Sequence, residues 1–220
     1  MDSRGPYPSV CFDRQSGREA GMGGVLRAMA EIYVSLMPAI LAGVLNMAWV
    51  KTPVLCSWAR PIDGGREWAD GRRILGDHKT WKGLAGMLVL GAFCGLVWGM
   101  VTAATPLAPY NLFHVDHAPT PGWNALTGGL LGLAYGLFEL PNSFLKRRVG
   151  ITPGKTAQGG WAWFFVVLDQ IDSVIGCALV FALLAPVGIG MFLGIIVVGG
   201  LTHVVLNLLL FTARLRDNPL

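Results

Sequence analysis

The sequence predicts an all-α fold, a polytopic bundle of about five membrane-spanning helices. Hydrophobic residues make up 53% of the 220-residue chain and charged residues only 14%, whereas a soluble domain carries about 25% charged residues. The apolar residues fall in long blocks, and a hydrocarbon core of roughly 30 Å needs about 20 apolar residues per helix. Backbone polar groups cannot go unpaired in lipid, so we expect blocks of this length to be helical.

Five apolar blocks are candidate spans, and the third of them is short. They cover residues 32–50, 84–104, 125–140, 161–184 and 187–211. We expect one compact domain over residues 31–220, with loops at 51–82 and 141–160. Residues 1–30 are polar and indicate a loose arm or a surface-lying segment. No apolar segment precedes residue 32, so a cleavable signal peptide is not indicated.

Basic residues are distributed unevenly between the two sides of this predicted bundle. The loops at 51–82 and 141–160 and the C-terminal tail hold thirteen of the 17 Lys and Arg residues, and the arm holds the other four. The loops after the second and fourth blocks hold none. The positive-inside rule therefore predicts a multi-pass protein of the cell membrane, with the N-terminus outside and both basic loops and the C-terminus in the cytoplasm.

Two aspartates interrupt the fourth apolar block, in the segment VVLDQIDSVIG. Asp169 and Asp172 each cost about 2.5–3.5 kcal/mol near the centre of a membrane helix. At spacing i, i+3 they share one helix face, where two carboxylates can hold a hard cation such as Mg²⁺. The alternatives are an ion pair with a basic residue from a cytoplasmic loop and the proton relay of a transporter. Of these three, the two aspartates on one face favour the metal site.

The first basic loop reads PIDGGREWADGRRILGDHKTWKG and combines glycines with cations. Glycines at 64, 65, 71, 76 and 83 permit close backbone approach and positive φ. The basic residues that can neutralise a triphosphate are Arg72, Arg73, Lys79 and Lys82. A P-loop is excluded, because Lys79 and Thr80 come two positions late and no strand precedes them. The alternative is juxtamembrane anchoring to anionic lipid.

Further polar side chains follow the third block and lie within the fifth. Ser143, Lys146, Arg147 and Arg148 come after the third block, where Arg supplies a bidentate fork for phosphate and Lys a point charge. In the fifth block, His203 and Asn207 lie at i, i+4 on one helix face. By themselves, these two residues indicate hydrogen bonds to a neighbouring helix.

Taken together, these segments resemble the CDP-archaeol synthase family of membrane cytidylyltransferases, over residues 36–220. The matching pieces occur in family order, as PIDGGREWADGRRILGDHKTWKG, SFLKRR, LDQIDS and HVVLNLLLFTARLRDNPL. A more distant similarity is to bacterial phosphatidate cytidylyltransferases, which pair a KTW-x-G element with S-x-x-K-R and D-R-x-D elements. Here these elements begin at Lys79, Ser143 and Asp169.

The resemblance implies a magnesium-dependent transfer of a cytidylyl group from CTP to a membrane lipid phosphate, giving a CDP-lipid and pyrophosphate. It implies that Asp169 and Asp172 bind metal, with catalytic contacts from Lys79, Lys146 and Arg147. It also implies phosphate contacts from Thr80 and Ser143 and a supporting role for Asp77. The other candidate substrate-binding residues come from the basic loops and the fifth block: Arg72, Arg73, Lys82, Arg148, His203 and Asn207.

One segment departs from the family pattern. Where we expect a Gly-Asp pair before S-x-x-K-R, the chain has Glu139-Leu140-Pro141-Asn142. Glu139 takes the aspartate position and becomes the third candidate metal ligand. Pro141 should bend or end the helix there.

Other functions remain open at this point. A CDP-alcohol phosphotransferase would need a further acidic pair, but the next acidic residue after Asp172 is Asp217. A cation-coupled transporter could use the same aspartates, although no inverted repeat is evident, and an inactive family member could serve as a binding partner. No nucleic-acid partner is indicated. A homo-oligomer is suggested by a small-residue face in the third block, formed by Gly128, Gly129, Gly132 and Gly136.

Overall fold

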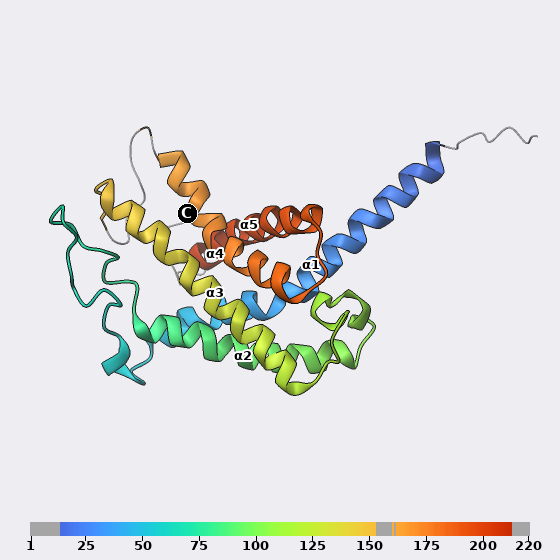
Figure 1. The fold of residues 1–220 in the computed structure, drawn as a ribbon, viewed down its shortest axis with the longest axis horizontal. Coiled ribbons are helices and arrows are strands. Elements are labelled where there is room, and N and C mark those ends of the chain that lie inside the picture. Colours follow the sequence, from blue (N-terminus) through green and yellow to red (C-terminus); the bar gives the residue numbers. More distant parts are fainter. Residues whose placement is uncertain (1–13, 153–159, 161, 213–220) are drawn as a thin grey trace, which may run out of the picture.

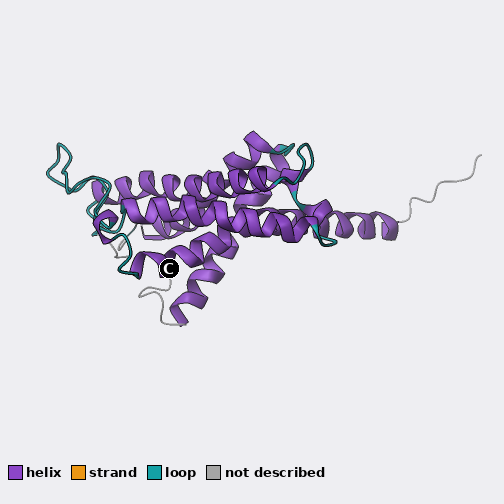
Figure 2. Ribbon diagram, turned by 90° about the horizontal axis from the view of Figure 1, so that it is seen from below, coloured by secondary structure: helices purple, strands orange, loops and turns teal. Residues whose placement is uncertain are grey.

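A computed structural model describes residues 14–152, 160 and 162–212, and the side chains from residue 23 onward. Its described part contains five long helices and no named strand, which confirms the all-α prediction (Figure 2). The helices are α1 (Arg14–Lys51), α2 (Trp81–Ala103), α3 (Pro121–Arg148), α4 (Ala162–Leu184) and α5 (Ile189–Thr212). Three short 3₁₀ turns lie in the loops, at Cys56–Trp58, Ala108–Tyr110 and Leu112–His114.

Four of these helices are long and apolar enough to cross a membrane by length and composition: α1 from Gly23, α2, α4 and α5. The third predicted span, within α3, does not reach the same apolar content. Glycines and polar side chains such as Asn124 and Thr127 dilute it, and its last turns carry three basic residues. Helix α3 packs instead between α2 and α4, where neighbouring helices surround its polar groups.

The polar N-terminal arm is partly a helix. Helix α1 begins at Arg14 and runs unbroken through 38 residues to Lys51, so residues 14–30 continue the first span and the expected loose or surface-lying segment is wrong for this part. Such a helix is about 57 Å long, well beyond a hydrocarbon core of roughly 30 Å. Its N-terminal part projects past the other helices (Figure 1). Residues 1–13 lie outside the described part.

Pro141 does not end α3, so of the expected bend or end the second is wrong. The helix continues through Pro141 to Arg148, although proline removes one backbone hydrogen bond and crowds the preceding turn. Side-chain contacts flank this point: Glu139 pairs with Lys79 before it, and Asn142 binds the aspartates of α4 after it. Because helical register persists, Asn142 and Lys146 stay four residues apart on one face, turned toward α4.

Helices α2 and α3 touch backbone to backbone through glycines. A Cβ atom added to Gly128 would lie 2.3 Å from the carbonyl oxygen of Gly91, and one added to Gly132 would lie 2.0 Å from that of Met87. The small-residue face that suggested a homo-oligomer is therefore covered by α2 of the same chain.

The two ends of the bundle are built differently. At one end, the loop between α1 and α2 docks on the last turn of α3: Arg148 Nη2 donates to the carbonyl oxygen of Arg73 at 2.5 Å, and Trp68 meets Phe144 edge to face at 5.4 Å. At the other end, Ser35 Oγ accepts a hydrogen bond from Leu112 N at 2.9 Å. The predicted sharing of one end by the two basic loops holds for their described residues.

Candidate active site

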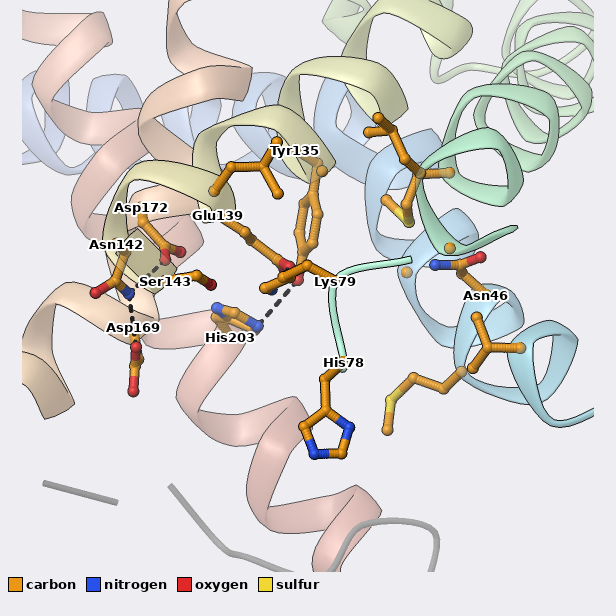
Figure 3. Close-up of a pocket in the computed structure, with 18 of the residues that line it drawn as sticks. Asn46, His78, Lys79, Tyr135, Glu139, Asn142, Ser143, Asp169, Asp172 and His203 are labelled. Atoms are coloured by element: carbon orange, nitrogen blue, oxygen red, sulfur yellow. Dashed lines mark hydrogen bonds and ion pairs between the residues drawn. The ribbon is translucent and has the colours of Figure 1, made fainter. Parts of the chain in front are cut away.

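A cavity of about 910 Å³ opens at the end of the bundle that carries the basic loops. All five helices and the loop before α2 contribute to its lining. Its α1 wall is largely apolar, with Leu36, Ile40, Val44 and Met47. The α3 and α4 walls carry Glu139, Asn142, Asp169 and Asp172, which gather on one side of Figure 3. An apolar wall facing a charged wall suits a substrate with a lipid part and a phosphate part.

The two aspartates of α4 converge on one side chain of α3. Asn142 Nδ2 donates to Asp169 Oδ1 at 2.6 Å and to Asp172 Oδ2 at 2.7 Å (Figure 3). Lys146 Nζ, one turn along α3, donates to the other oxygen of Asp169 at 2.5 Å. The predicted shared face of Asp169 and Asp172 is thus turned toward α3, and Asp172 is buried within it.

Glu139 lies beside this pair and is held by a cation from the loop. Its Oε2 accepts from the Lys79 ammonium, and its Oε1 accepts from Ser173 Oγ at 3.3 Å. Burial alone would lower the pKa of Lys79, but the charge of Glu139 and the hydrogen bond to it raise that pKa above its ordinary value. In this arrangement Glu139 neutralises Lys79 rather than joining the aspartates.

The cluster fits a small hard cation only in part. Among the side chains that the structure describes, no three His, Cys, Asp or Glu groups stand in the arrangement of a metal site. Two carboxylate oxygens nevertheless meet at one nitrogen, and the buried Oδ1 of that same Asn142 has no hydrogen-bond partner. Oxygen donors of this kind are what Mg²⁺ prefers. Asp169 and Asp172 therefore fit the predicted ion, whereas Glu139 lies outside the convergence.

A chain of hydrogen bonds joins α3, α4 and α5 across the cavity. Tyr135 OH and His203 Nε2 are 3.0 Å apart, and His203 Nδ1 lies 3.3 Å from the carbonyl oxygen of Gln170. Asn207 Nδ2 donates to Gln170 Oε1 at 2.9 Å. The interhelical hydrogen bonds expected for His203 and Asn207 are confirmed, and both residues also line the cavity.

The loop between α1 and α2 is organised around Asp63. Its carboxylate accepts from the amides of Gly65, Leu75 and Gly76 and from Arg73 Nη2 at 2.8 Å. Burial opposes ionisation, but these hydrogen bonds prevail and hold the pKa of Asp63 well below its usual value. The predicted positive φ is found at four of the five glycines, at 64, 65, 71 and 76, whereas Gly83 is helical within α2.

Several predicted phosphate contacts serve the scaffold in this conformation. Arg73 bridges Asp63 and Asp77, and Thr80 Oγ1 caps α2 by accepting from Gly83 N at 3.1 Å. Lys82 Nζ donates to the carbonyl oxygen of Thr52 at 2.6 Å.

The arginines around the end of α3 bind main-chain oxygens. Arg72 donates to the carbonyl oxygen of Arg148, Arg148 pairs with Asp70, and Arg147 donates to the carbonyl oxygen of Ile151. All predicted site residues line the cavity except Arg72, Arg73 and Arg148, which join the loop to α3 just beside it.

Some cavity residues escaped the sequence reasoning. Asn46 of α1 carries a buried Oδ1 with no hydrogen-bond partner, and it faces the charged wall across the cavity (Figure 3). The available signal was an asparagine inside an apolar block, since polar residues within membrane helices are rare and often functional. Asn142 was noticed only as part of the departure from the family pattern.

The fold has four helices that are long and apolar enough to cross a membrane, and a cavity with one charged and one apolar wall. These features define a polytopic membrane protein. Comparison with known sequences then shows that the chain belongs to the CDP-archaeol synthase family, because the profile of that family, described as CarS-like, matches residues 28–220. The resemblance found in the motifs is confirmed, as is the predicted enzyme class, a CTP-dependent nucleotidyltransferase of lipid biosynthesis.

Individual relatives agree with this assignment. The CDP-archaeol synthase of Thermococcus kodakarensis is 35% identical over 159 residues, which are 72% of this chain and 77% of the relative. That of Methanosphaerula palustris is 33% identical over 166 residues, 72% of this chain and 89% of the relative. A solved structure, described as an intramembrane enzyme for archaeal membrane lipids biosynthesis, matches with a TM-score of 0.54 and 26% identity over 80% of this chain and 91% of that one.

Proposed function

We propose that the protein transfers the cytidylyl group of CTP to a membrane lipid phosphate, and that the reaction depends on Mg²⁺ and takes place at the α3–α4 wall of the cavity. A lipid phosphate oxygen attacks the α-phosphorus of CTP. The bond from that phosphorus to the α,β-bridging oxygen breaks, and pyrophosphate leaves. The attacking phosphate is already an anion, so the reaction needs no strong general base.

The observation that carries the proposal is the convergence of Asp169 and Asp172 beside two ammonium groups, those of Lys79 and Lys146. Asp169 and Asp172 would hold the ion. When bound, Mg²⁺ lowers the repulsion between two phosphates and stabilises the departing pyrophosphate. Each lysine now neutralises a carboxylate, and each can turn to a phosphate oxygen as charge develops there.

The cavity also supports the division between two substrates. The α1 wall presents Leu36, Ile40, Val44 and Met47, which suit isoprenoid or acyl chains. The polar end is bordered by the basic loops, which suits CTP arriving from water. Both substrates would then meet with their phosphates at the charged wall.

The test is turnover by purified protein in detergent. Labelled CTP should give a lipid-extractable CDP product only when Mg²⁺ and a lipid phosphate are both present, and the assay should offer phosphatidic acid beside an archaeal-type ether lipid phosphate. Asp172→Asn, which keeps the shape of the side chain, should abolish turnover without lowering the melting temperature.

Other outcomes identify the competing functions. Release of CMP from added CDP-lipid, with no consumption of CTP, would indicate a CDP-alcohol phosphotransferase. Absence of any covalent product in folded protein would exclude the cytidylyltransferase: binding of CTP would then indicate a binding partner, and cation uptake into vesicles a transporter.

A further inference from the structure

We propose that Asn142 is the third protein ligand of the cation, in place of Glu139, through its side-chain carbonyl oxygen. This inference rests on the magnesium-dependent function proposed above and assigns the residue that completes its site. In the structure the Asn142 amide donates hydrogen bonds to both aspartates. A turn of the amide by about 180° would present its oxygen to an ion bound between them.

The first support is that each aspartate has one oxygen fixed and the other aimed at Asn142. Lys146 holds Oδ2 of Asp169, which leaves Oδ1 for Asn142. The backbone N of Ser173 holds Oδ1 of Asp172 at 2.6 Å, which leaves Oδ2 for Asn142. Partners of this kind orient the ligands of metal sites.

The second support is the unpaired oxygen of the same side chain. Asn142 is only 5% exposed, and its buried Oδ1 has no hydrogen-bond partner. A buried acceptor without a partner is costly and calls for an explanation. The two ends of an amide have nearly the same shape, so the turn changes no packing. It exchanges two donated hydrogen bonds for one more oxygen ligand, which is favourable only when a cation lies between the carboxylates.

The third support is that Glu139 is occupied. Lys79 and Ser173 bind its two oxygens. Moving Glu139 to the ion would leave the partly buried Lys79 ammonium without its counter-charge, which is costly. A neutral amide ligand avoids this, and it lies on the same helix face as Lys146, one turn away. The departure from the Gly-Asp pattern thus moves the third ligand from position 139 to position 142.

The experiment measures metal binding apart from catalysis. Mn²⁺ binding to the full chain in detergent is followed by electron paramagnetic resonance, and the rise in melting temperature with Mn²⁺ gives a second readout. Three variants are compared: Asn142→Leu removes the polar atoms of the side chain but keeps its branched shape and number of heavy atoms, Asn142→Asp keeps an oxygen but cannot donate, and Glu139→Gln removes the competing carboxylate.

We expect Asn142→Leu to weaken Mn²⁺ binding by about tenfold or more, since even residues that only support metal ligands change affinity by about 10–100-fold. Asn142→Asp should bind Mn²⁺ at least as tightly as the wild type, and its melting temperature should rise more on adding Mn²⁺, because the ion relieves the repulsion of three carboxylates. Glu139→Gln should stay within about twofold of the wild type, as expected for a group outside the ligand set.

The outcomes separate this inference from the proposed function. If Asn142 acts only as a hydrogen-bond donor, Asn142→Asp will bind Mn²⁺ as poorly as Asn142→Leu, and the inference fails. It fails also if both variants bind like the wild type or if Glu139→Gln alone loses the metal, while the proposed function stands provided Asp169→Asn and Asp172→Asn lose Mn²⁺. Absence of Mn²⁺ binding by the wild type, with and without CTP, would overturn both.

Discussion

Asp63 is the residue on which the shape of the loop between α1 and α2 depends. Its carboxylate is 1% exposed and accepts hydrogen bonds from three backbone amides and Arg73. In Asp63→Asn, an NH₂ group must face some of these donors, so we expect the loop to be destabilised by about 1–3 kcal/mol, the cost of leaving buried donors unpaired. Faster trypsin cleavage within residues 60–82 would report the opening.

Asp77, the other carboxylate that pairs with Arg73, provides the matched control. Asp77 pairs with Arg73 but its side chain is 69% exposed, and exposed ion pairs contribute at most about 1 kcal/mol. Asp77→Asn should therefore leave the cleavage rate near that of the wild type. Equal rates for the two variants would show that Asp63 does not organise the loop.

The same residue gives the loop a pH dependence with a definite sign. The pKa of Asp63 is lower in the folded loop than in an open chain, so its stabilising contribution is complete at pH values above about 4, the unfolded pKa of an aspartate. It declines as the pH falls below that value toward the folded pKa. Asp63→Asn should lack this decline.

Single site residues could be predicted where a charged side chain interrupts an apolar block. Asp169 and Asp172 could be predicted to share a site because charge within a membrane helix needs a partner. The partners themselves could not be predicted. Asn142, Ser173 and Glu139 lie on two helices, and whether an amide or a carboxylate meets the aspartates depends on packing that no local pattern records.

At the scale of elements, the contact between α2 and α3 depends on the absence of side chains. A Cβ on Gly95 would lie 2.3 Å from the carbonyl oxygen of Asn124 and 2.7 Å from the Cα of Gly128. We expect Gly95→Ala to destabilise the protein by about 1–3 kcal/mol, as overpacking does, although alanine favours a helix by about 0.8–1.0 kcal/mol. Thermal unfolding in one detergent measures the difference.

Gly190, in the first turn of α5, is the control for that change. No heavy atom lies within 4 Å of a Cβ added there, so Gly190→Ala should be neutral or slightly stabilising. If Gly95→Ala melted at or above the temperature of Gly190→Ala, the close contact between α2 and α3 would be wrong.

The helices were predictable in number and approximate position, because apolar blocks of this length have few alternatives in lipid. Their ends and partners were less so. Proline chemistry predicted a bend or an end at Pro141, yet α3 continues through it to Arg148. The glycine face of α3 was recognised as a packing surface, but its small residues carry no mark that says whether α2 or a second copy lies against them.

At the scale of the whole molecule, the charge pattern anticipated that the basic segments gather at one end. The contacts that join them span about a third of the chain, as between Arg72 and Arg148, and no local signal in the sequence announces such pairs. The cavity arises only from that assembly. Its walls combine an apolar face of α1 with polar faces of α3 and α4, which are separate in sequence.

The distribution of basic residues also predicts how the bundle is oriented in the membrane. The end with the cavity carries Lys and Arg from both basic loops, whereas residues 104–120 at the opposite end hold none, so the cavity should face the cytoplasm. Cys56 is exposed in the loop between α1 and α2. It can serve as a single native probe once Cys11, Cys94 and Cys177 are replaced by alanine, and Asp116→Cys in a cysteine-free chain probes the other end. In intact cells an impermeant maleimide should label the Asp116→Cys variant. It should label Cys56 only after the cells are permeabilised. The reverse pattern would place the cavity outside, away from cytoplasmic CTP, and would contradict both the topology and the proposed substrate.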